Sequence, residues 1–385
     1  MVPESTLTKP TPTIPLKLRE MSKQLPDNKQ MDSAAAATYQ PATHRLATLL
    51  VLIVFPLIWV GGLVTTTDAG MAVPDWPNTF GYNLFLYPMY DWFFGPWDLF
   101  VEHGHRLLAS IAGLVTLILT VVVARRDTRG WFVILSWLTL GMVLLQGLLG
   151  GVRVLMADVN LAMIHGCTGP VYFMLVISMW VFSSRWWLSN ERIQEARLPQ
   201  KTSFSIIWMS SIMLLVCTAQ LILGANMRHV SVDASPMFFQ NLIVAHVLTA
   251  AIIFIGSIML GMVCLAPTLR RLGFARYGLG LLLCVTVQIG LGVGSWVVKY
   301  GLPLGMGSGT GSGAGSQFAS GFVVAEKDFA QTSIVTAHVA TGSLILAILT
   351  FILCRSIRIR TMESTAREPA TVIQSNANPK LEITT

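Results

Sequence analysis

Long apolar runs separated by short polar segments dominate the hydropathy pattern of this chain. Eight runs are long enough to cross about 30 Å of hydrocarbon as α-helices. They cover residues 46–64, 103–124, 131–150, 161–182, 205–224, 241–265, 278–298 and 333–354. No run shows the apolar–polar alternation of strands in a membrane barrel. The pattern therefore predicts an all-α membrane protein with eight transmembrane helices.

The composition agrees with a polytopic membrane protein. The chain has 385 residues, of which 53% are apolar and only 12% are charged, whereas soluble globular proteins carry about 25% charged residues. Its net charge of +7 would suit nucleic-acid binding, but the basic residues punctuate the apolar runs and form no stripe interleaved with aromatics. We therefore expect membrane lipids, and no nucleic acid, among the partners.

The distribution of Lys and Arg predicts the orientation. The two tails and the loops after the second, fourth and sixth runs hold 21 of these residues. The opposite side holds the other five, which are Arg106, Arg153, Arg228, Lys299 and Lys327. Because positive charge is retained on the cytoplasmic side, both termini are expected in the cytoplasm. The expected location is the inner (cytoplasmic) membrane of the cell, as a multi-pass protein.

The spans divide into two halves of four. Gln146, Gln220 and Gln288 each precede Gly near the outer end of the third, fifth and seventh spans, which indicates a parallel pseudo-repeat. The expected organisation is a disordered cytoplasmic tail (1–45), an N-terminal four-helix bundle (46–184) with an outer loop (65–101), a cytoplasmic linker (185–204), a C-terminal four-helix bundle (205–356) with a Gly/Ser-rich outer loop (299–332), and a second disordered cytoplasmic tail (357–385).

The N-terminal segment and the positions of the cysteines argue against a signal peptide and against a disulfide in the outer loops. The first 45 residues are polar and have no apolar core, so they do not resemble a signal peptide. The five cysteines all lie within or at the ends of spans. We expect them to be buried small apolar residues, with no disulfide in the outer loops.

Four histidines occupy equivalent places. His105, His165, His246 and His338 begin the second, fourth, sixth and eighth spans, so they lie at similar depth under the outer surface. The residue four positions later is small in each case, which leaves room for a flat ligand or for close helix packing. One such histidine is most simply a packing residue. Four together suggest two heme sites with paired axial imidazoles, most simply His105 with His165 and His246 with His338.

Only one of these histidines has a nearby carboxylate. Glu102 lies three residues before His105 and shares its helix face, whereas His103 points away. Arg106 can pair with Glu102 or with a heme propionate. A solvated residue at a helix N-terminus is the simpler interpretation of Glu102, but the asymmetry between the halves favours a reaction site in the first and a cofactor site in the second.

At these residues the chain resembles the heme A synthase family. "EHGHR" matches the E-x-x-H-R motif of that family through Glu102, His105 and Arg106. "TTTDAGMAVPDWP", residues 65–77, is similar to its first outer loop, and "NLAMIHG", "AHVLTA" and "AHVATG" match its other histidine helices. The resemblance covers residues 46–355. Val73 departs from the family where many members have a Cys before P-D-W-P, which excludes a thiol relay through this loop, and "TTTDAG" lacks the Arg seen in many relatives.

The resemblance implies a fold, a reaction and a set of site residues. The fold is two pseudo-symmetric four-helix bundles. His105 and His165, with Arg106, would bind the substrate heme O, and His246 and His338 would be the axial ligands of a heme b cofactor.

The reaction implied is an oxidation. Glu102 would be catalytic beside the C8 methyl group, which is oxidised to a formyl group through hydroxylated intermediates for cytochrome oxidase biogenesis. The implied partners are heme O synthase and an electron acceptor in the membrane. The oligomeric state, including a homo-oligomer, stays open.

Two other classes of function stay open. A diheme b-type electron-transfer protein would use the same four imidazoles, and a heme transporter or chaperone would use them as docking points. Neither of these functions would use Glu102 or the first outer loop. That loop, 65–101, has no Lys or Arg, four Asp and many aromatics. We expect it to lie at the outer interface and to cap the substrate site.

Overall fold

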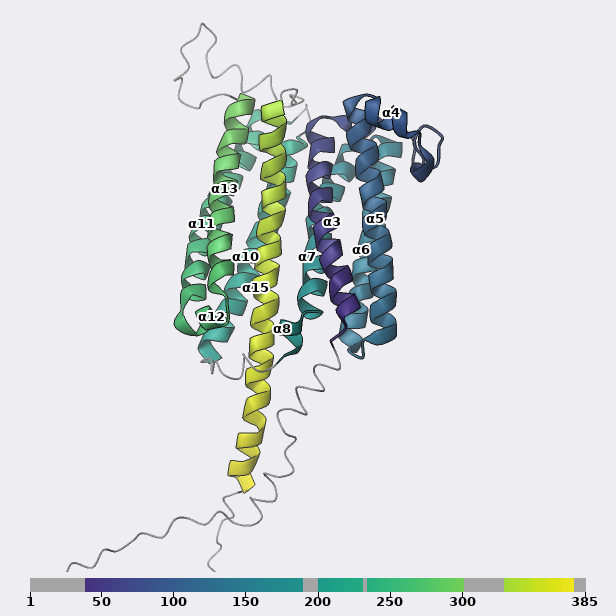
Figure 1. Cartoon of the computed structure of the whole chain (residues 1–385). Coiled ribbons are helices and arrows are strands. Elements are labelled where there is room, and N and C mark those ends of the chain that lie inside the picture. Colours follow the sequence, from purple (N-terminus) through teal and green to yellow (C-terminus); the bar gives the residue numbers. More distant parts are fainter. Residues whose placement is uncertain (1–38, 190–199, 231–233, 301–328, 377–385) are drawn as a thin grey trace, which may run out of the picture.

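The computed structural model describes residues 39–189, 200–230, 234–300 and 329–376. Within these ranges the chain is helical, with one isolated β-bridge between Thr79 and Tyr82 and no strand. Eight helices are long and apolar enough to cross a membrane. The expectation of an all-α membrane protein with eight transmembrane helices is therefore confirmed. Figure 1 shows these helices side by side, with both ends of the described chain on one side of the layer.

The first four long helices form one bundle. They are α3 (Pro41–Thr66), α5 (Trp97–Arg126), α6 (Gly130–Met156) and α7 (Val159–Phe182). Each contacts the next, and α7 contacts α3 to close the ring. Its buried core joins Leu50 and Val54 of α3 with Leu119, Phe132 and Phe173 of the other three helices.

The second four long helices repeat this arrangement. They are α10 (Gln200–Arg228), α11 (Pro236–Leu265), α13 (Ala275–Tyr300) and α15 (Phe329–Asn376). The contacts run in the same order, from α10 through α11 and α13 to α15 and back. The two bundles meet where α15 packs against α3 and α7, and α10 touches α7.

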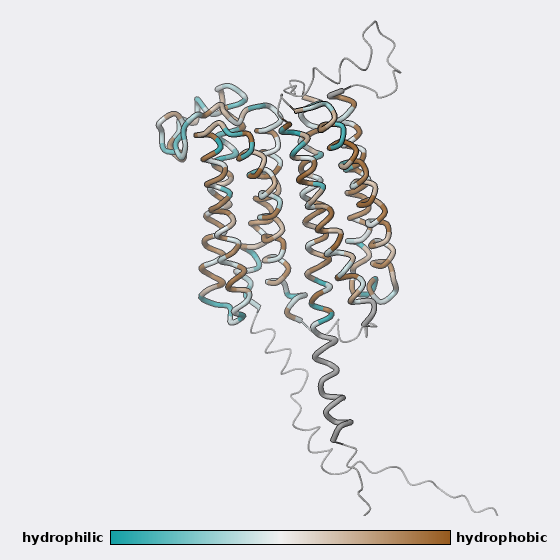
Figure 2. Tube along the Cα trace, turned by 180° about the vertical axis from the view of Figure 1, so that it is seen from behind, coloured by the Kyte–Doolittle hydropathy of each residue, from teal (hydrophilic) through white to brown (hydrophobic). Residues whose placement is uncertain are grey.

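Short elements connect the long helices. The first outer loop contains η1 (Ala69–Met71), η2 (Leu84–Leu86) and α4 (Met89–Phe94), while α8 (Arg185–Leu188) and α12 (Pro267–Arg271) lie at the opposite ends of the bundles. Side-chain caps begin two of the long helices: Asp158 accepts from the backbone N–H of Leu161 in α7, and Ser235 accepts from that of Phe238 in α11. Figure 2 shows apolar residues along the helix shafts and polar ones toward their ends.

The helices extend beyond the apolar runs from which they were expected. α3 begins at Pro41 rather than 46, α5 begins at Trp97 inside the expected outer loop, and α15 continues to Asn376 beyond the boundary at 356. A hydropathy window detects the part of a helix inside hydrocarbon, but backbone hydrogen bonding continues into polar sequence. The tail before 39, most of the linker (190–199) and the Gly/Ser-rich segment 301–328 lie outside the described residues.

Candidate functional site

The four aligned histidines lie in two pairs, one in each bundle. The ring centroids of His105 on α5 and His165 on α7 are 6.4 Å apart. Those of His246 on α11 and His338 on α15 are also 6.4 Å apart. Helices α5 and α7 are opposite members of the first ring, as are α11 and α15 of the second. Each pair therefore faces across the middle of its bundle.

Each imidazole lies against a glycine of the preceding long helix. A Cβ added to Gly61, Gly150, Gly224 or Gly292 would stand between 2.9 and 3.2 Å from Cε1 of a histidine ring, which is closer than ordinary contact. The corresponding rings belong to His105, His165, His246 and His338. The same contact recurs in four places, so a larger residue at any of these glycines would require the histidine ring to shift.

The histidine pairs fit a heme iron better than a bare metal ion. Two imidazole–metal bonds of about 2 Å, end to end across one metal, need ring centroids about 6 Å apart. Among the residues that the structure describes, no group of three or more His, Cys, Asp or Glu could hold a metal ion. A pair of imidazoles alone suits an iron whose other ligands come from a porphyrin.

A histidine that binds a metal through one ring nitrogen usually donates a hydrogen bond from the other. Nδ1 of His338 lies 3.2 Å from the backbone carbonyl oxygen of Gln288, a contact of the kind that orients metal-ligating histidines. The Gln288 amide nitrogen is 3.4 Å from Nε2 of the same ring. The His105 and His165 rings interact in the same way with the backbone of Leu57 and Gln146, each four residues before the contacting glycine. Nδ1 of His246 is buried and has no hydrogen-bond partner among the described residues.

The glutamines that precede the glycines contact the neighbouring long helix close to the histidines. The Gln146 amide donates to Oγ1 of Thr168, and the Gln220 amide donates to the backbone carbonyl of His246 at 3.0 Å. A Cβ on Gly342, four residues after His338, would stand 3.4 Å from the Gln288 amide. Gly169 and Gly342, one turn after His165 and His338, thus leave room for Gln146 and Gln288.

Glu102 is buried, at 2% exposure, and is not a solvated helix-end residue. One carboxylate oxygen accepts from the Arg106 guanidinium at 2.7 Å, and the other accepts from the backbone N–H of Val73 at 2.9 Å. A carboxylate has about four acceptor positions, so this arrangement leaves capacity for a proton or a water. His105 lies on the same helix, three residues along.

Arg106 holds the first outer loop on the bundle. Its two terminal nitrogens donate to the carbonyl oxygens of Val73, Asp75 and Asn78 and to the Glu102 carboxylate, at 2.7 to 2.9 Å. These four bonds occupy all four terminal N–H groups. Glu102, one of the two partners expected for Arg106, is in contact with it.

Further contacts order the same loop. The Asp75 carboxylate accepts from the backbone N–H groups of Phe80 and Gly81, at 2.9 and 2.8 Å. Burial raises the pKa of Asp75, but these two bonds and the nearby Arg106 outweigh it, so that the pKa lies below its usual value.

His103 is buried against the loop and lies 3.0 Å from the Thr79 hydroxyl, as expected for a histidine facing away from the first pair.

Trp76 brings the loop over α6. Its indole covers Gly151 so closely that a Cβ there would overlap the ring, at 2.3 Å. Gly151 adjoins Gly150, which contacts His165. The loop therefore packs on α6 next to the glycine that contacts His165.

Arg153 belongs to this site and was not expected there. Its guanidinium lies against Gly70 of η1, and it is near enough to interact electrostatically with Glu102 and His165. Its Nε is buried and has no partner among the described residues. The sequence placed Arg153 three residues after Gly150, near the outer end of the third span. It could not show the contact with η1, so Arg153 was counted only among the charges on the outer side.

Arg228 joins the two bundles. Its guanidinium donates to Oγ1 of Thr66 and to the carbonyl of Gly62, both on α3. The Thr336 hydroxyl of α15 donates to Thr66 as well, at 3.3 Å. Thr336 lies two residues before His338, so this contact connects the bundles beside the second histidine pair.

Comparison with known proteins gives a partial likeness. No protein-family model matches the chain. A segment of 123 residues is 32% identical to a protein named Heme A synthase from Oceanobacillus iheyensis, and the match covers 30% of this chain and 37% of that protein. The chain thus matches little more than a third of the length of this curated relative. It is a multi-pass membrane protein similar to part of a Heme A synthase.

Proposed function

We propose that this protein is an oxidoreductase of the heme A synthase type, which converts heme O to heme A in the membrane. The reaction oxidises the C8 methyl group to a formyl group through hydroxylated intermediates. The observation that carries the proposal is an asymmetry between two equivalent sites. Both bundles hold a histidine pair at the spacing of two axial ligands, but among the described residues only the first pair has a buried carboxylate within one helical turn of one of its histidines. The partial likeness to a Heme A synthase supports the same activity.

In the first bundle, His105 and His165 would bind the iron of heme O and thereby fix the position of the ring. Gly61 and Gly150 let the two imidazoles approach from opposite sides. Arg153 is the guanidinium best placed for a propionate, since the terminal N–H groups of Arg106 are all engaged within the protein.

Conversion of a methyl to a formyl group adds an oxygen atom, which water can supply, and releases protons together with electrons that pass to the electron acceptor, so a base is needed at the site. Glu102 would take these protons or stabilise a cationic intermediate. Arg106 and the Val73 N–H hold its carboxylate in one orientation. The first outer loop, with Trp76 on Gly151, would cap the substrate site.

In the second bundle, His246 and His338 would hold heme b. When bound, heme b supplies one-electron transfer. Gln288 orients the His338 ring through its carbonyl, and the residues equivalent to Glu102 are apolar, which suits a site that only moves electrons. An electron acceptor and heme O synthase in the same membrane are the partners that this function requires.

The proposed location is the cytoplasmic membrane, with both termini in the cytoplasm. The excess of Lys and Arg on the side of the termini supports this orientation. Both histidine pairs and the first outer loop then lie toward the outer side.

Expression together with heme O synthase, followed by extraction and chromatography of the pigments, tests the function. A heme A synthase yields heme A or its alcohol precursor. A diheme electron-transfer protein or a heme carrier returns its heme unchanged, and that result would exclude the proposed activity.

A further inference from the structure

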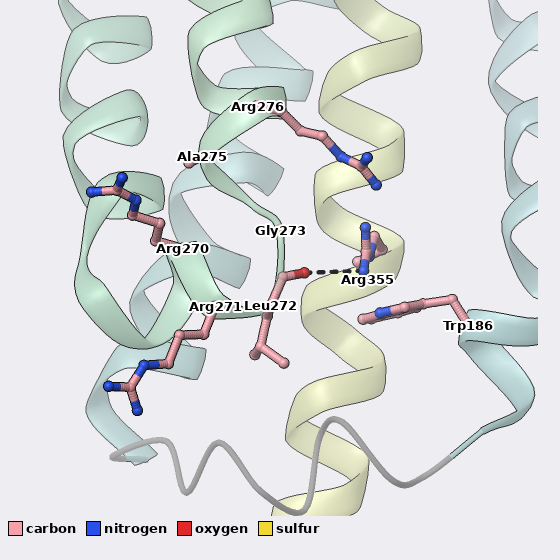
Figure 3. Close-up of a pocket in the computed structure, with 8 residues that line it drawn as sticks. All are labelled: Trp186, Arg270, Arg271, Leu272, Gly273, Ala275, Arg276 and Arg355. Carbon is pink, nitrogen blue, oxygen red and sulfur yellow. Dashed lines mark hydrogen bonds between the residues drawn. The ribbon is translucent and has the colours of Figure 1, made fainter.

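A hollow of about 330 Å³ lies at the end of the second bundle opposite the histidine pairs. It is formed by the turn from α12 to α13, by α15 and by α8 (Figure 3). Its lining residues are Trp186, Arg270, Arg271, Leu272, Gly273, Ala275, Arg276 and Arg355. Four of these eight are arginines, so the hollow carries strong positive charge.

Arg355 places a buried charge at the inner wall. It is 4% exposed and lies 3.5 Å from the ring centroid of Trp186. Its guanidinium donates to the carbonyl of Leu272 and to the hydroxyl of Tyr277, at 3.2 and 3.3 Å. In Figure 3, Arg276 reaches from α13 toward Arg355, and Trp186 faces Arg355 from α8. The α12–α13 turn is thus held to α15 through a cation.

Arg270, Arg271 and Arg276 are exposed, and none forms an ion pair with a described carboxylate. The equivalent turn of the first bundle differs. There Arg129 is paired with Asp127 at 2.7 Å, and its Nε donates to the other carboxylate oxygen. The turn of the first bundle thus has an acidic residue beside its arginines, whereas no acidic residue lies between Arg270 and Arg276, so the α12–α13 turn is the more strongly positive of the two.

The hollow is at the depth of lipid headgroups. The span of α11 ends at Leu265, and that of α13 begins at Ala275. Met262, Leu265 and Leu279 expose apolar side chains beside it, where acyl chains can lie. A second hollow of about 430 Å³, lined by Leu265, Pro267, Arg270 and Arg271, shares two of the arginines. Trp186 is of the residue type that anchors proteins at this level.

We propose that the α12–α13 turn binds the phosphodiester headgroup of an anionic phospholipid, with its acyl chains along α11 and α13. Guanidinium groups suit phosphate oxygens, and basic pockets between helix ends bind such headgroups. Two adjoining hollows that share Arg270 and Arg271 suit a lipid with two phosphates, such as cardiolipin. This site is remote from both histidine pairs and does not depend on the proposed function.

Native mass spectrometry of the detergent-purified full chain, titrated with cardiolipin or with phosphatidylcholine, tests the proposal. The Arg270→Gln/Arg271→Gln variant should bind cardiolipin at least about tenfold more weakly than the unmodified protein. The matched control is Arg125→Gln/Arg126→Gln, which removes two exposed charges from the same end of the first bundle. It should retain cardiolipin binding within about twofold.

Equal losses in the two double variants, or equal binding of phosphatidylcholine, would overturn the site. Inorganic phosphate at millimolar concentration provides a further arm. If it displaces cardiolipin from the unmodified protein, the arginines form a site for soluble anions, and the lipid assignment is wrong. If the double variant does not fold, Arg276→Gln alone should weaken cardiolipin binding by about threefold or more, and unchanged binding would contradict the proposal.

Discussion

The imidazole of His338 lies directly against Gly292, so that a Cβ at this glycine would stand 3.1 Å from Cε1 of the ring. The other three aligned histidines each contact a glycine in the same way. These glycines are spaced along α3, α6, α10 and α13 at the level of the rings. The contact makes the position of each imidazole sensitive to a single methyl group on a neighbouring helix.

Gly292→Ala should displace the His338 ring. We expect an altered absorbance spectrum of bound heme b and a loss of about 1–3 kcal/mol in the free energy of unfolding, because the added methyl group overpacks the site. The control is Gly290→Ala on the same helix, where an added Cβ meets no described atom within 4 Å. That variant should be as stable or more stable, since alanine favours a helix by about 1 kcal/mol over glycine. Identical spectra for both would show that the glycine contact does not position the ring.

His246→Leu and His338→Leu should each remove or perturb the low-spin heme spectrum of the purified protein, because one axial ligand is lost. His44→Leu is a control at the other end of the first bundle, where the His44 ring contacts the hydroxyl of Ser183. Its heme spectrum should match that of the unmodified protein. Unaltered spectra in both ligand variants would refute the assignment of this pair to heme b.

Glu102→Gln should retain heme and stop at heme O or at a hydroxylated intermediate. The glutamine keeps the shape and can still accept from the Val73 N–H, but it removes the charge that pairs with Arg106. Loss of one charged hydrogen bond costs about 1–3 kcal/mol of stability, which heat denaturation can measure separately from the extracted pigments. Production of heme A at the normal rate by this variant would show that Glu102 only holds the loop in place.

Trp76→Ala should impair formation of heme A while leaving heme b bound. The indole covers Gly151 in the first bundle and is remote from the second histidine pair, so only the substrate site would lose its cap. Pigment extraction measures the product, and the absorbance of the purified protein measures heme b. Equal losses of both would indicate that the loop serves folding of the whole protein.

The Asp75 turn should open at acid pH. The pKa of Asp75 in the folded protein is below its usual value of about 3.9. The stabilisation that its carboxylate gives to the turn is therefore present above that value and is lost as pH falls through the folded pKa. Hydrogen exchange of the Phe80 and Gly81 amides should therefore be slow and constant near neutral pH, after correction for intrinsic rates, and rise below about pH 4. Asp75→Asn should show faster exchange than the unmodified protein near neutral pH, with the difference narrowing at acid pH, and equal exchange near neutral pH would exclude the carboxylate as the cap.

Much of the fold follows from the sequence because its signals are local. Burial of apolar side chains in hydrocarbon and satisfaction of the backbone within one helix depend on neighbours in the chain, so eight spans, their order and the level of His105, His165, His246 and His338 were predictable. The periodicity of α5 likewise predicted that Glu102 and Arg106 share a face. The helix ends were misplaced because hydropathy does not detect the polar turns beyond the hydrocarbon.

The tertiary structure decided which groups meet across the bundles. Glu102 accepts from Val73, Arg153 reaches Gly70, and Trp76 covers Gly151. Each contact joins a helix to a loop that folds back over it, and its geometry depends on how helices pack rather than on periodicity along either one. The same is true of the glycine behind each histidine, because only the neighbouring helix determines where a Cβ would fall.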